Sequence, residues 1–237
     1  MASTSHLKRN NMPASWPVKK KNITFVVSPN PGSHKREYVV PVVILLRDLL
    51  GVAATSKEVK QIVHNEEVLI NGKKVNDIKT PVGIFDIFEI KKTNEKYVLL
   101  FNQVGRINLV PTKDDLIYLK ITGKKILSNN KFQFNFMNGF NILIDKKSFS
   151  TAKVNDTVVY DFTKKKVSSI INLKEGNFVY VFDGKFKGTL AEIKSFINYN
   201  GVSKDIIVLD IEGKEQSTIK DYCYVIGTKK TDIKRFA

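Results

Sequence analysis

The 237-residue chain lacks several features that whole classes of protein require. Its single cysteine, Cys223, excludes an internal disulfide and any zinc site built on two or more thiolates. The longest apolar stretch, Val39 to Leu46, is interrupted by Pro41 and is far shorter than the ~20 residues that span a bilayer. No apolar run follows the basic residues at the N-terminus, so we expect no secretory signal. These absences predict a soluble protein of a reducing, cytoplasmic compartment.

Recognisable signatures of catalysis are also missing. The chain has no Gly-x-x-x-x-Gly-Lys-Ser/Thr loop of the kind that holds nucleotide phosphates. The three histidines, His6, His34 and His64, are too widely separated to suggest a metal site. Cys223 lies between two tyrosines and is expected to be a packing residue, and Asp114-Asp115 fits a turn or a helix start. We therefore expect no enzyme: no catalytic residue, no metal and no cofactor.

Positive charge, in contrast, is abundant. The chain has 39 Lys and Arg against 23 Asp and Glu, a formal net charge of +16. The excess is largest in residues 1–40 and in residues 93–170. Such charge predicts a polyanionic partner, with nucleic acid favoured over an anionic membrane surface. A composition that is 42% hydrophobic indicates folded domains and argues against a disordered polybasic chain.

Residues 1–40 are predicted to form a basic N-terminal arm. Four prolines prevent one regular helix, and the only sizeable apolar run, Ile23 to Val27, is too short to form a core. We therefore expect this arm to become ordered only on its partner.

Residues 41–92 predict two helices followed by a small sheet. The stretch Pro41–Gly51 has the pattern of a helix that begins at a proline and ends at a glycine. Thr55 and Glu58 form the capping box of a second helix. Asn71-Gly72 predicts a two-residue hairpin turn, because both residues tolerate positive φ, and Ile84–Ile90 predicts a further strand.

The central region, residues 93–170, is predicted to be a β domain. Phe132, Phe134 and Phe136 alternate with polar residues in one hairpin. Aromatic rows can stack on the bases of single-stranded RNA, but three phenylalanines at period two are more typical of a half-buried strand. We therefore interpret them as core, and the lysines of this region as the better candidates for phosphate contact.

Residues 171–227 predict a small five-stranded barrel, followed by a tail at residues 228–237. The loop Gly184–Gly188 places two lysines and a phenylalanine between glycines, so that backbone and side chains can both approach a sugar-phosphate. The chain as a whole is expected to be α+β and mostly β.

Several short motifs occur in a fixed order along the chain: SHLKR at 5–9, PGSHK at 31–35, LLRDLL at 45–50, INGKKVND at 70–77, PVGIFDI at 81–87, KVNDT at 153–157, EGN at 175–177 and DGKFKG at 183–188. Their order and spacing resemble the archaeal and eukaryotic S-four-e family of small-subunit ribosomal proteins. The resemblance implies an S-four-like RNA-binding domain over residues 41–92 and a KOW/SH3-like barrel over residues 171–227. The chain departs from the family pattern in two places: the usual Asp-Gly-Lys-Val-Arg reads Asn71-Gly72-Lys73-Lys74-Val75 here, and Ala191 stands where a glycine is usual after the KOW turn.

The resemblance implies a structural component of the small ribosomal subunit that supports translation in the cytoplasm. The implied partners are small-subunit ribosomal RNA and neighbouring ribosomal proteins, with no role for a membrane or DNA. Family pattern and basic character together indicate these RNA-binding residues: Lys8, Arg9, Trp16, Lys19, Lys20, Lys21, His34, Lys35, Arg36, Arg47, Lys57, Lys60, Lys73, Lys74, Lys185 and Lys187. The residues expected to shape turns are Asn71, Gly72, Gly184 and Gly188.

Two alternatives remain open from the sequence. Some RNA-modifying enzymes carry a similar small RNA-binding domain, although no catalytic constellation accompanies it here. A transcription or translation factor can use a KOW barrel transiently, but a free-standing factor gains little from a long basic arm.

Overall fold

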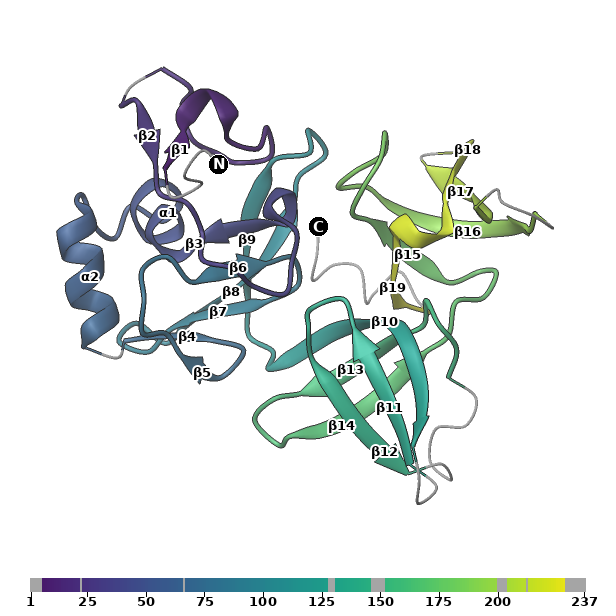
Figure 1. The fold of residues 1–237 in the computed structure, drawn as a ribbon. Helices are drawn as coiled ribbons and strands as arrows, with labels where there is room; N and C mark the ends of the chain where they lie inside the picture. Colours follow the sequence, from purple (N-terminus) through teal and green to yellow (C-terminus); the bar gives the residue numbers. More distant parts are fainter. Residues whose placement is uncertain are drawn as a thin grey trace. The chain divides into compact units, whose positions relative to one another are not determined.

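The computed structural model describes residues 6–21, 23–65, 67–127, 131–145, 152–199, 204–211 and 213–228. The chain divides into two compact units (Figure 1). The first comprises Met1–Phe101 and Gly105–Asp115, and the second comprises Asn102–Val104 and Leu116–Ala237. Short helices occur with many strands, so the expected α+β, mostly β class is confirmed. Of the predicted tail, everything beyond Thr228 lies outside the described residues.

The N-terminal arm is folded onto the first unit. Its elements are β1 (Leu7–Lys8), the 3-10 helix η1 (Arg9–Asn11), β2 (Phe25–Val26), the 3-10 helix η2 (Arg36–Tyr38) and β3 (Val39–Pro41). Trp16 is 2% exposed and Tyr38 4%. Backbone hydrogen bonds join Ile107 N to Ser15 O (2.8 Å) and Asn30 N to Lys79 O (2.9 Å).

These contacts correct the expectation that the arm is ordered only on a partner. The arm has no apolar run long enough for a core of its own, but its scattered apolar side chains are buried within the first unit. Those side chains are Leu7, Met12, Trp16, Val26 and Tyr38.

The two predicted helices are present. The first runs through α1 (Val42–Ile44) into the π-helical segment η3 (Leu45–Leu49), in which Leu50 N donates to Leu45 O (2.9 Å). Gly51 follows with φ of 66°. The second helix, α2 (Ser56–His64), has the expected capping box: Glu58 N donates to Thr55 Oγ1 (3.3 Å), and the Glu58 carboxylate accepts from Ala54 N (2.8 Å).

The sheet of the first unit has the order β5-β4-β7-β8-β9, and β6 pairs with β3. The strands are β4 (Val68–Ile70), β5 (Lys73–Lys74), β6 (Pro81–Gly83), β7 (Ile87–Ile90), β8 (Glu95–Phe101) and β9 (Ile107–Thr112). Asn71 and Gly72 have φ of 51° and 72°, so the expected two-residue turn is observed.

Two boundaries in this region differ from expectation. The strand predicted for Ile84–Ile90 begins only at Ile87, because Phe85 has φ of 63° and interrupts extended backbone. The expected domain boundary between residues 92 and 93 falls inside the sheet, since β8 pairs with β7 along its length. A turn at residues 91–94 resembles a linker in sequence, but here it only reverses the chain within one sheet.

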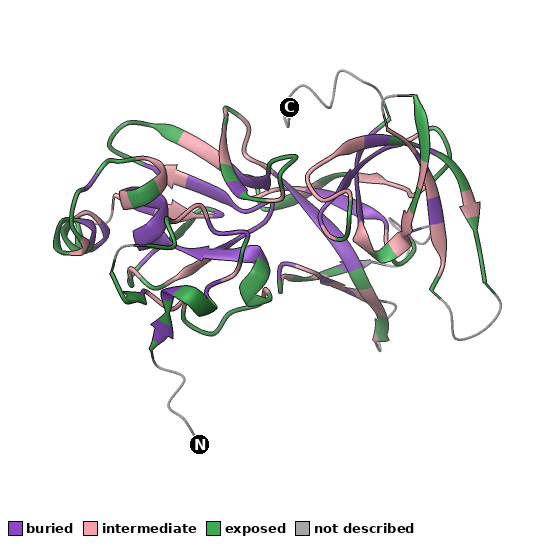
Figure 2. Ribbon diagram, turned by 90° about the horizontal axis from the view of Figure 1, so that it is seen from above, coloured by how far each residue is buried: buried purple, intermediate pink, exposed green. Residues whose placement is uncertain are grey.

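The second unit contains two five-stranded antiparallel sheets. The first has the order β12-β11-β10-β13-β14, formed by β10 (Leu116–Leu127), β11 (Lys131–Phe136), β12 (Asn141–Asp145), β13 (Thr157–Asp161) and β14 (Lys166–Ile171). The second has the order β18-β17-β16-β15-β19, formed by β15 (Phe178–Val181), β16 (Leu190–Ile197), β17 (Ile206–Ile211), β18 (Lys214–Ile219) and β19 (Cys223–Gly227). Figure 2 shows buried residues concentrated on strands.

The phenylalanine row of β11 belongs to the core. Phe132, Phe134 and Phe136 are 5%, 0% and 4% exposed, which confirms the core interpretation over base stacking. Lys124 lies with its Nζ 4.3 Å from the Phe132 ring centre and donates to Ala152 O (3.1 Å). This lysine is therefore engaged within the unit.

Lys120 is the most buried lysine among the described residues, at 3% exposure. Its Nζ donates to Asp221 O (2.6 Å) and Cys223 O (2.8 Å), and the hydroxyl of Tyr224 accepts from Lys120 N (3.1 Å). Burial lowers the pKa of Lys120 to about 8. The expectation that the lysines of residues 93–170 contact phosphate is wrong for Lys120, whose ammonium group connects β10 to the β19 end of the second sheet.

Candidate nucleic-acid interface

The outer face of α2 is basic and polar. Its inner face is buried through Val59 and Val63, which are 0% and 2% exposed, because apolar residues recur at helical spacing. The outer face borders a hollow of about 720 Å³ lined by Lys57, Lys60, Gln61, His64 and Asn65. This face presents donors and positive charge to a polyanion.

The β4–β5 hairpin presents two further lysines. Lys73 and Lys74 form β5, an edge strand, and are exposed. The turn before them is fixed by Asn71, whose Nδ2 donates to Asp86 Oδ1 (2.9 Å) and whose Oδ1 accepts from Ile87 N (2.8 Å). The sheet thus holds the two lysines in a defined position.

A buried polar network, made of His34, Asn71 and Asp86, joins the arm to this hairpin. The side chains of His34 and Asp86 are 5% and 7% exposed, and His34 Nε2 lies 3.5 Å from Asp86 Oδ2. Asp86 also accepts from Gly83 N (2.7 Å). Burial alone raises the pKa of Asp86, but the hydrogen bonds and charge supplied by His34, Asn71 and the Gly83 amide outweigh it, so the pKa lies below its ordinary value.

Two glycines permit the close approach of the arm. A Cβ on Gly83 would lie 2.3 Å from the His34 ring, and a Cβ on Gly32 would lie 2.7 Å from Pro81 Cγ. Any larger residue at position 83 would have to displace the imidazole. The motifs PGSHK and PVGIFDI are therefore two sides of one contact.

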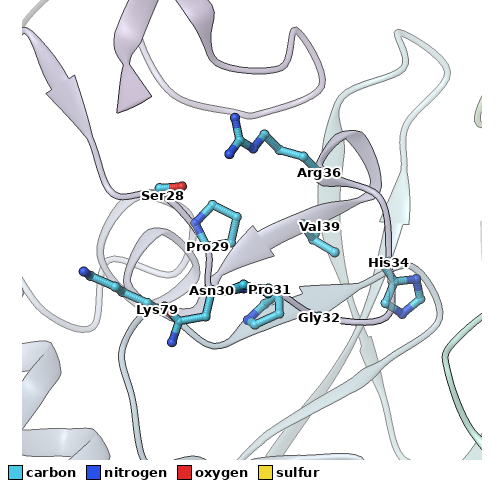
Figure 3. A pocket seen from close by; sticks show the side chains of 10 residues that line it. Ser28, Pro29, Asn30, Pro31, Gly32, His34, Arg36, Val39 and Lys79 are labelled. Atoms are coloured by element: carbon cyan, nitrogen blue, oxygen red, sulfur yellow. The ribbon is translucent and has the colours of Figure 1, made fainter. Parts of the chain in front are cut away.

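Beside this contact the arm forms a pocket of about 430 Å³ (Figure 3). It is lined by Ser28, Pro29, Asn30, Pro31, Gly32, His34, Arg36, Val39, Lys79 and Pro81. The pocket thus combines rigid proline rings with two cationic side chains.

Most of the predicted RNA-binding residues are at the surface. Those classed as exposed are Lys8, Lys19, Lys20, Lys21, Lys35, Arg36, Lys57, Lys60, Lys73, Lys74 and Lys185. Lys187 is half-buried, and Arg47 is half-buried and pairs with Asp48 (2.7 Å).

Three of the predicted RNA contacts have side chains that are largely buried in the structure. Arg9 is 6% exposed, and its Nη1 donates to Lys19 O (2.5 Å). Trp16 is 2% exposed, and the His34 side chain 5%. The family motifs identify these positions but say nothing of burial, and in the structure all three side chains hold the arm in its folded path.

The loop of residues 183–188 is a tight turn. Gly184 and Gly188 have φ of 85° and 83°, a region that residues with a Cβ rarely adopt. Lys185 is exposed, with its Nζ 5.5 Å from the centre of the Phe186 ring, and Phe186 packs against the core of the second sheet. The phenylalanine is thus an anchor that leaves the lysine at the surface.

Two residues that shape this region were not predicted from the sequence. Asp86 stands between apolar residues in PVGIFDI, and that position was the available sign of a buried carboxylate. Lys79 lines the pocket, but nothing in its sequence neighbourhood indicates proximity to the arm.

Neither a metal centre nor a membrane span is found in the described part of the chain. Across these residues, no three His, Cys, Asp or Glu side chains gather into a group able to hold a metal ion. Across the same ranges, no helix has the length and apolar character needed to cross a bilayer.

Comparison with known proteins gives a consistent result. The sequence model of ribosomal family S4e matches residues 93–167, and the model of the RS4NT (NUC023) domain matches residues 1–37. The small ribosomal subunit protein eS4 of Methanocaldococcus jannaschii is 32% identical over 97% of this chain and 96% of that protein. The protein of the same name from Archaeoglobus fulgidus is 32% identical over 96% and 95%.

A solved structure is also similar. The crystal structure of the 30S ribosomal protein S4e from Thermoplasma acidophilum superimposes with a TM-score of 0.69 at 28% identity. The match covers 81% of this chain and 97% of that one.

Proposed function

Because the chain belongs to ribosomal family S4e, we propose that it is a structural component of the small ribosomal subunit that binds small-subunit ribosomal RNA. The family is one of ribosomal structural proteins and not of enzymes. The observation that carries the proposal is similarity to eS4 over 97% of the chain, from the arm to the last strand. Its place of work is then the cytoplasmic ribosome, with other ribosomal proteins as neighbours.

The exposed cations are the proposed means of binding RNA. Positive side chains lie on three separate elements of the first unit: the arm, the outer face of α2 and the β4–β5 hairpin. Contacts of Lys and Arg with phosphates release counterions, which supplies affinity without base specificity. The proposed contacts are Lys8, Lys19, Lys20, Lys21, Lys35, Arg36, Arg47, Lys57, Lys60, Lys73, Lys74, Lys185 and Lys187.

We propose a domain layout on the same basis. Residues 41–92 form an S-four-like RNA-binding domain that carries the basic arm, and its sheet continues through β8 and β9 to about residue 115. The central β domain then comprises Leu116 to residue 170, and residues 171–227 form a KOW/SH3-like barrel. Two helices before an Asn-Gly hairpin support the first assignment, and five antiparallel strands with a glycine-bounded basic loop support the last.

The test is binding of the full chain to small-subunit ribosomal RNA at several salt concentrations. Lys57→Gln with Lys60→Gln removes two charges from the outer face of α2. Lys91→Gln with Lys92→Gln is the matched control, because it removes two exposed charges from a turn of the same unit. A plot of the logarithm of the binding constant against the logarithm of the salt concentration has a negative slope. The first pair should reduce the magnitude of this slope by about 2, while the control leaves it unchanged.

Three results would contradict the proposal. A nearly flat salt dependence of the unaltered chain would exclude phosphate contact as the main source of affinity. Equal losses for the two double variants would exclude a specific role of α2. Recovery of the native protein only in free fractions, never sedimenting with small subunits, would favour a transient factor.

A further inference from the structure

The pocket of the arm is built as a ligand site, and we define it as the PNPG pocket after Pro29, Asn30, Pro31 and Gly32. Its volume of about 430 Å³ lies in the range of about 300–1,000 Å³ typical of small-molecule sites. In Figure 3 the Pro29–Pro31 stretch lies between the side chains of Lys79 and His34, with Arg36 to one side. These residues come from two segments that are joined by the Asn30 N to Lys79 O hydrogen bond (2.9 Å).

The walls of the pocket are rigid. Three of its lining residues are prolines, whose φ is fixed by the ring. Gly32 allows the arm to approach Pro81 so closely that a Cβ there would lie 2.7 Å from the proline ring. Preformed proline rings of this kind can pack against a flat ring at little conformational cost.

The polar groups of the pocket favour an anion. Arg36 and Lys79 are its charged lining residues, and none of the ten lining residues is a carboxylate. Two carboxylates outside the lining contact lining residues, and both are engaged: Asp77 accepts from Asn30 Nδ2 (2.7 Å) and Lys79 N (3.1 Å), and Asp86 lies 3.5 Å from His34 Nε2 and accepts from Gly83 N (2.7 Å). Positive charge on the rim is therefore not neutralised by an acidic lining residue.

Both ring nitrogens of His34 are buried and have no hydrogen-bond partner among the described residues. His34 lines the pocket with a side chain 5% exposed. The imidazole thus forms a buried wall of the pocket, beside Asp86.

We propose that the PNPG pocket binds a single unstacked ribonucleotide of the ribosomal RNA. Its sugar and base pack on Pro29 and Pro31, and its phosphate is bound by Arg36 and Lys79. The proposal rests on the proposed RNA binding of the chain and adds to it a site for one nucleotide. RNA recognition commonly uses bases that have left the helical stack, as in bulges and loops.

The experiment titrates the full chain with each of the four nucleoside 5′-monophosphates, and separately with inorganic phosphate and with nucleosides. Backbone amide NMR shifts are followed. At least one nucleotide should give saturable shifts at Asn30, Gly32, His34 and Lys79. Inorganic phosphate and the nucleoside should each bind at least about tenfold more weakly, because each satisfies only part of the pocket.

Variants distinguish nucleotide binding in the pocket from general attraction by the positive charge of the chain. Arg36→Gln should weaken nucleotide binding about tenfold through loss of a charge-assisted contact. Lys92→Gln is the control, because it removes an equal charge from an exposed position of the same unit that is outside the pocket lining and the proposed RNA contacts, and binding should be unchanged. Ser28→Phe should fill the pocket and abolish binding while the amide spectrum remains that of a folded chain.

The proposal is overturned if no nucleotide gives saturable shifts, if phosphate alone binds as tightly, or if Arg36→Gln and Lys92→Gln behave alike. These outcomes are distinct from failure of the proposed function. If ribosomal RNA still binds with a normal salt dependence, only the nucleotide site is lost. If nucleotides bind but ribosomal RNA does not, the proposed function itself fails.

Discussion

His34 and Asp86 form a buried pair, with Nε2 of the imidazole 3.5 Å from Oδ2 of the carboxylate. His34 belongs to the arm and Asp86 to the segment between β6 and β7. Through Asn71 the same carboxylate also reaches the turn that carries Lys73 and Lys74. A change at His34 therefore affects the position of the arm and the surroundings of the hairpin together.

Replacement of His34 by alanine should destabilise the first unit by about 1–3 kcal/mol, because it removes the imidazole that lies 3.5 Å from a buried carboxylate. Trp16, the only tryptophan of the chain, is buried in this unit and reports its unfolding by fluorescence in denaturant. His64→Ala is the control, since His64 is exposed at the end of α2. An unchanged midpoint for His34→Ala would show that the pair contributes nothing.

Gly83→Ala should destabilise the same unit, because the new Cβ would lie 2.3 Å from the His34 ring. The cost should be about 1–3 kcal/mol in the native background and clearly smaller in a His34→Ala background, where the ring is absent. Trp16 fluorescence in denaturant again reports the unfolding of this unit. Equal costs in the two backgrounds would contradict the clash.

Lys120 should make the stability of the second unit rise between pH 8 and pH 9. Its pKa is about 8 when folded and 10.5 ordinarily, so the unfolded chain binds more protons above pH 8 and stability increases with pH. Burial raises the pKa of Cys223 from 9.0 to about 12, so the unfolded thiol ionises first and opposes the gain above pH 9. The expected rise is on the order of 1 kcal/mol.

Hydrogen exchange of the β10 amides measures this rise in the stability of the second unit with pH. Lys120→Met should abolish it and should also lower stability at pH 7, because the carbonyls of Asp221 and Cys223 lose their donor. Cys223→Ala should extend the rise beyond pH 9. A pH-independent exchange rate, after correction for intrinsic chemistry, would show that Lys120 is not buried as an ammonium group.

Thr55→Ala should cost about 1 kcal/mol, because it removes the acceptor for Glu58 N at the start of α2. Thr55→Ser keeps the hydroxyl and should retain most of that stability. The Trp16 unfolding midpoint is again the measurement. Equal midpoints for the two variants would show that the cap does not contribute to the stability of the unit.

Local signals in the sequence were sufficient for the parts of the fold that depend on near neighbours. The capping box at Thr55 and the turn at Asn71-Gly72 occur as expected, because each is determined by residues at most three apart. The phenylalanine row of β11 was interpreted correctly for the same reason, since period two places alternate side chains on one buried face.

The contacts of the arm could not be predicted, because they depend on distant parts of the chain. Arg9 and Trp16 stand among polar and basic residues that resemble an unfolded extension, yet both are buried. The neighbours of Lys120 are about a hundred residues away along the chain, so nothing near it in sequence indicated burial. Net charge alone therefore predicts more exposed basic residues than the structure has.

The separation of Lys120 from its acceptors has a consequence for biosynthesis. Lys120 and Cys223 are 103 positions apart, so β10 leaves the translating ribosome long before β19. Until β19 follows, the ammonium group has none of its carbonyl acceptors and remains in water. The second unit is thus expected to complete its folding late during translation. Until then, the charged ammonium group of Lys120 keeps this part of β10 in contact with water.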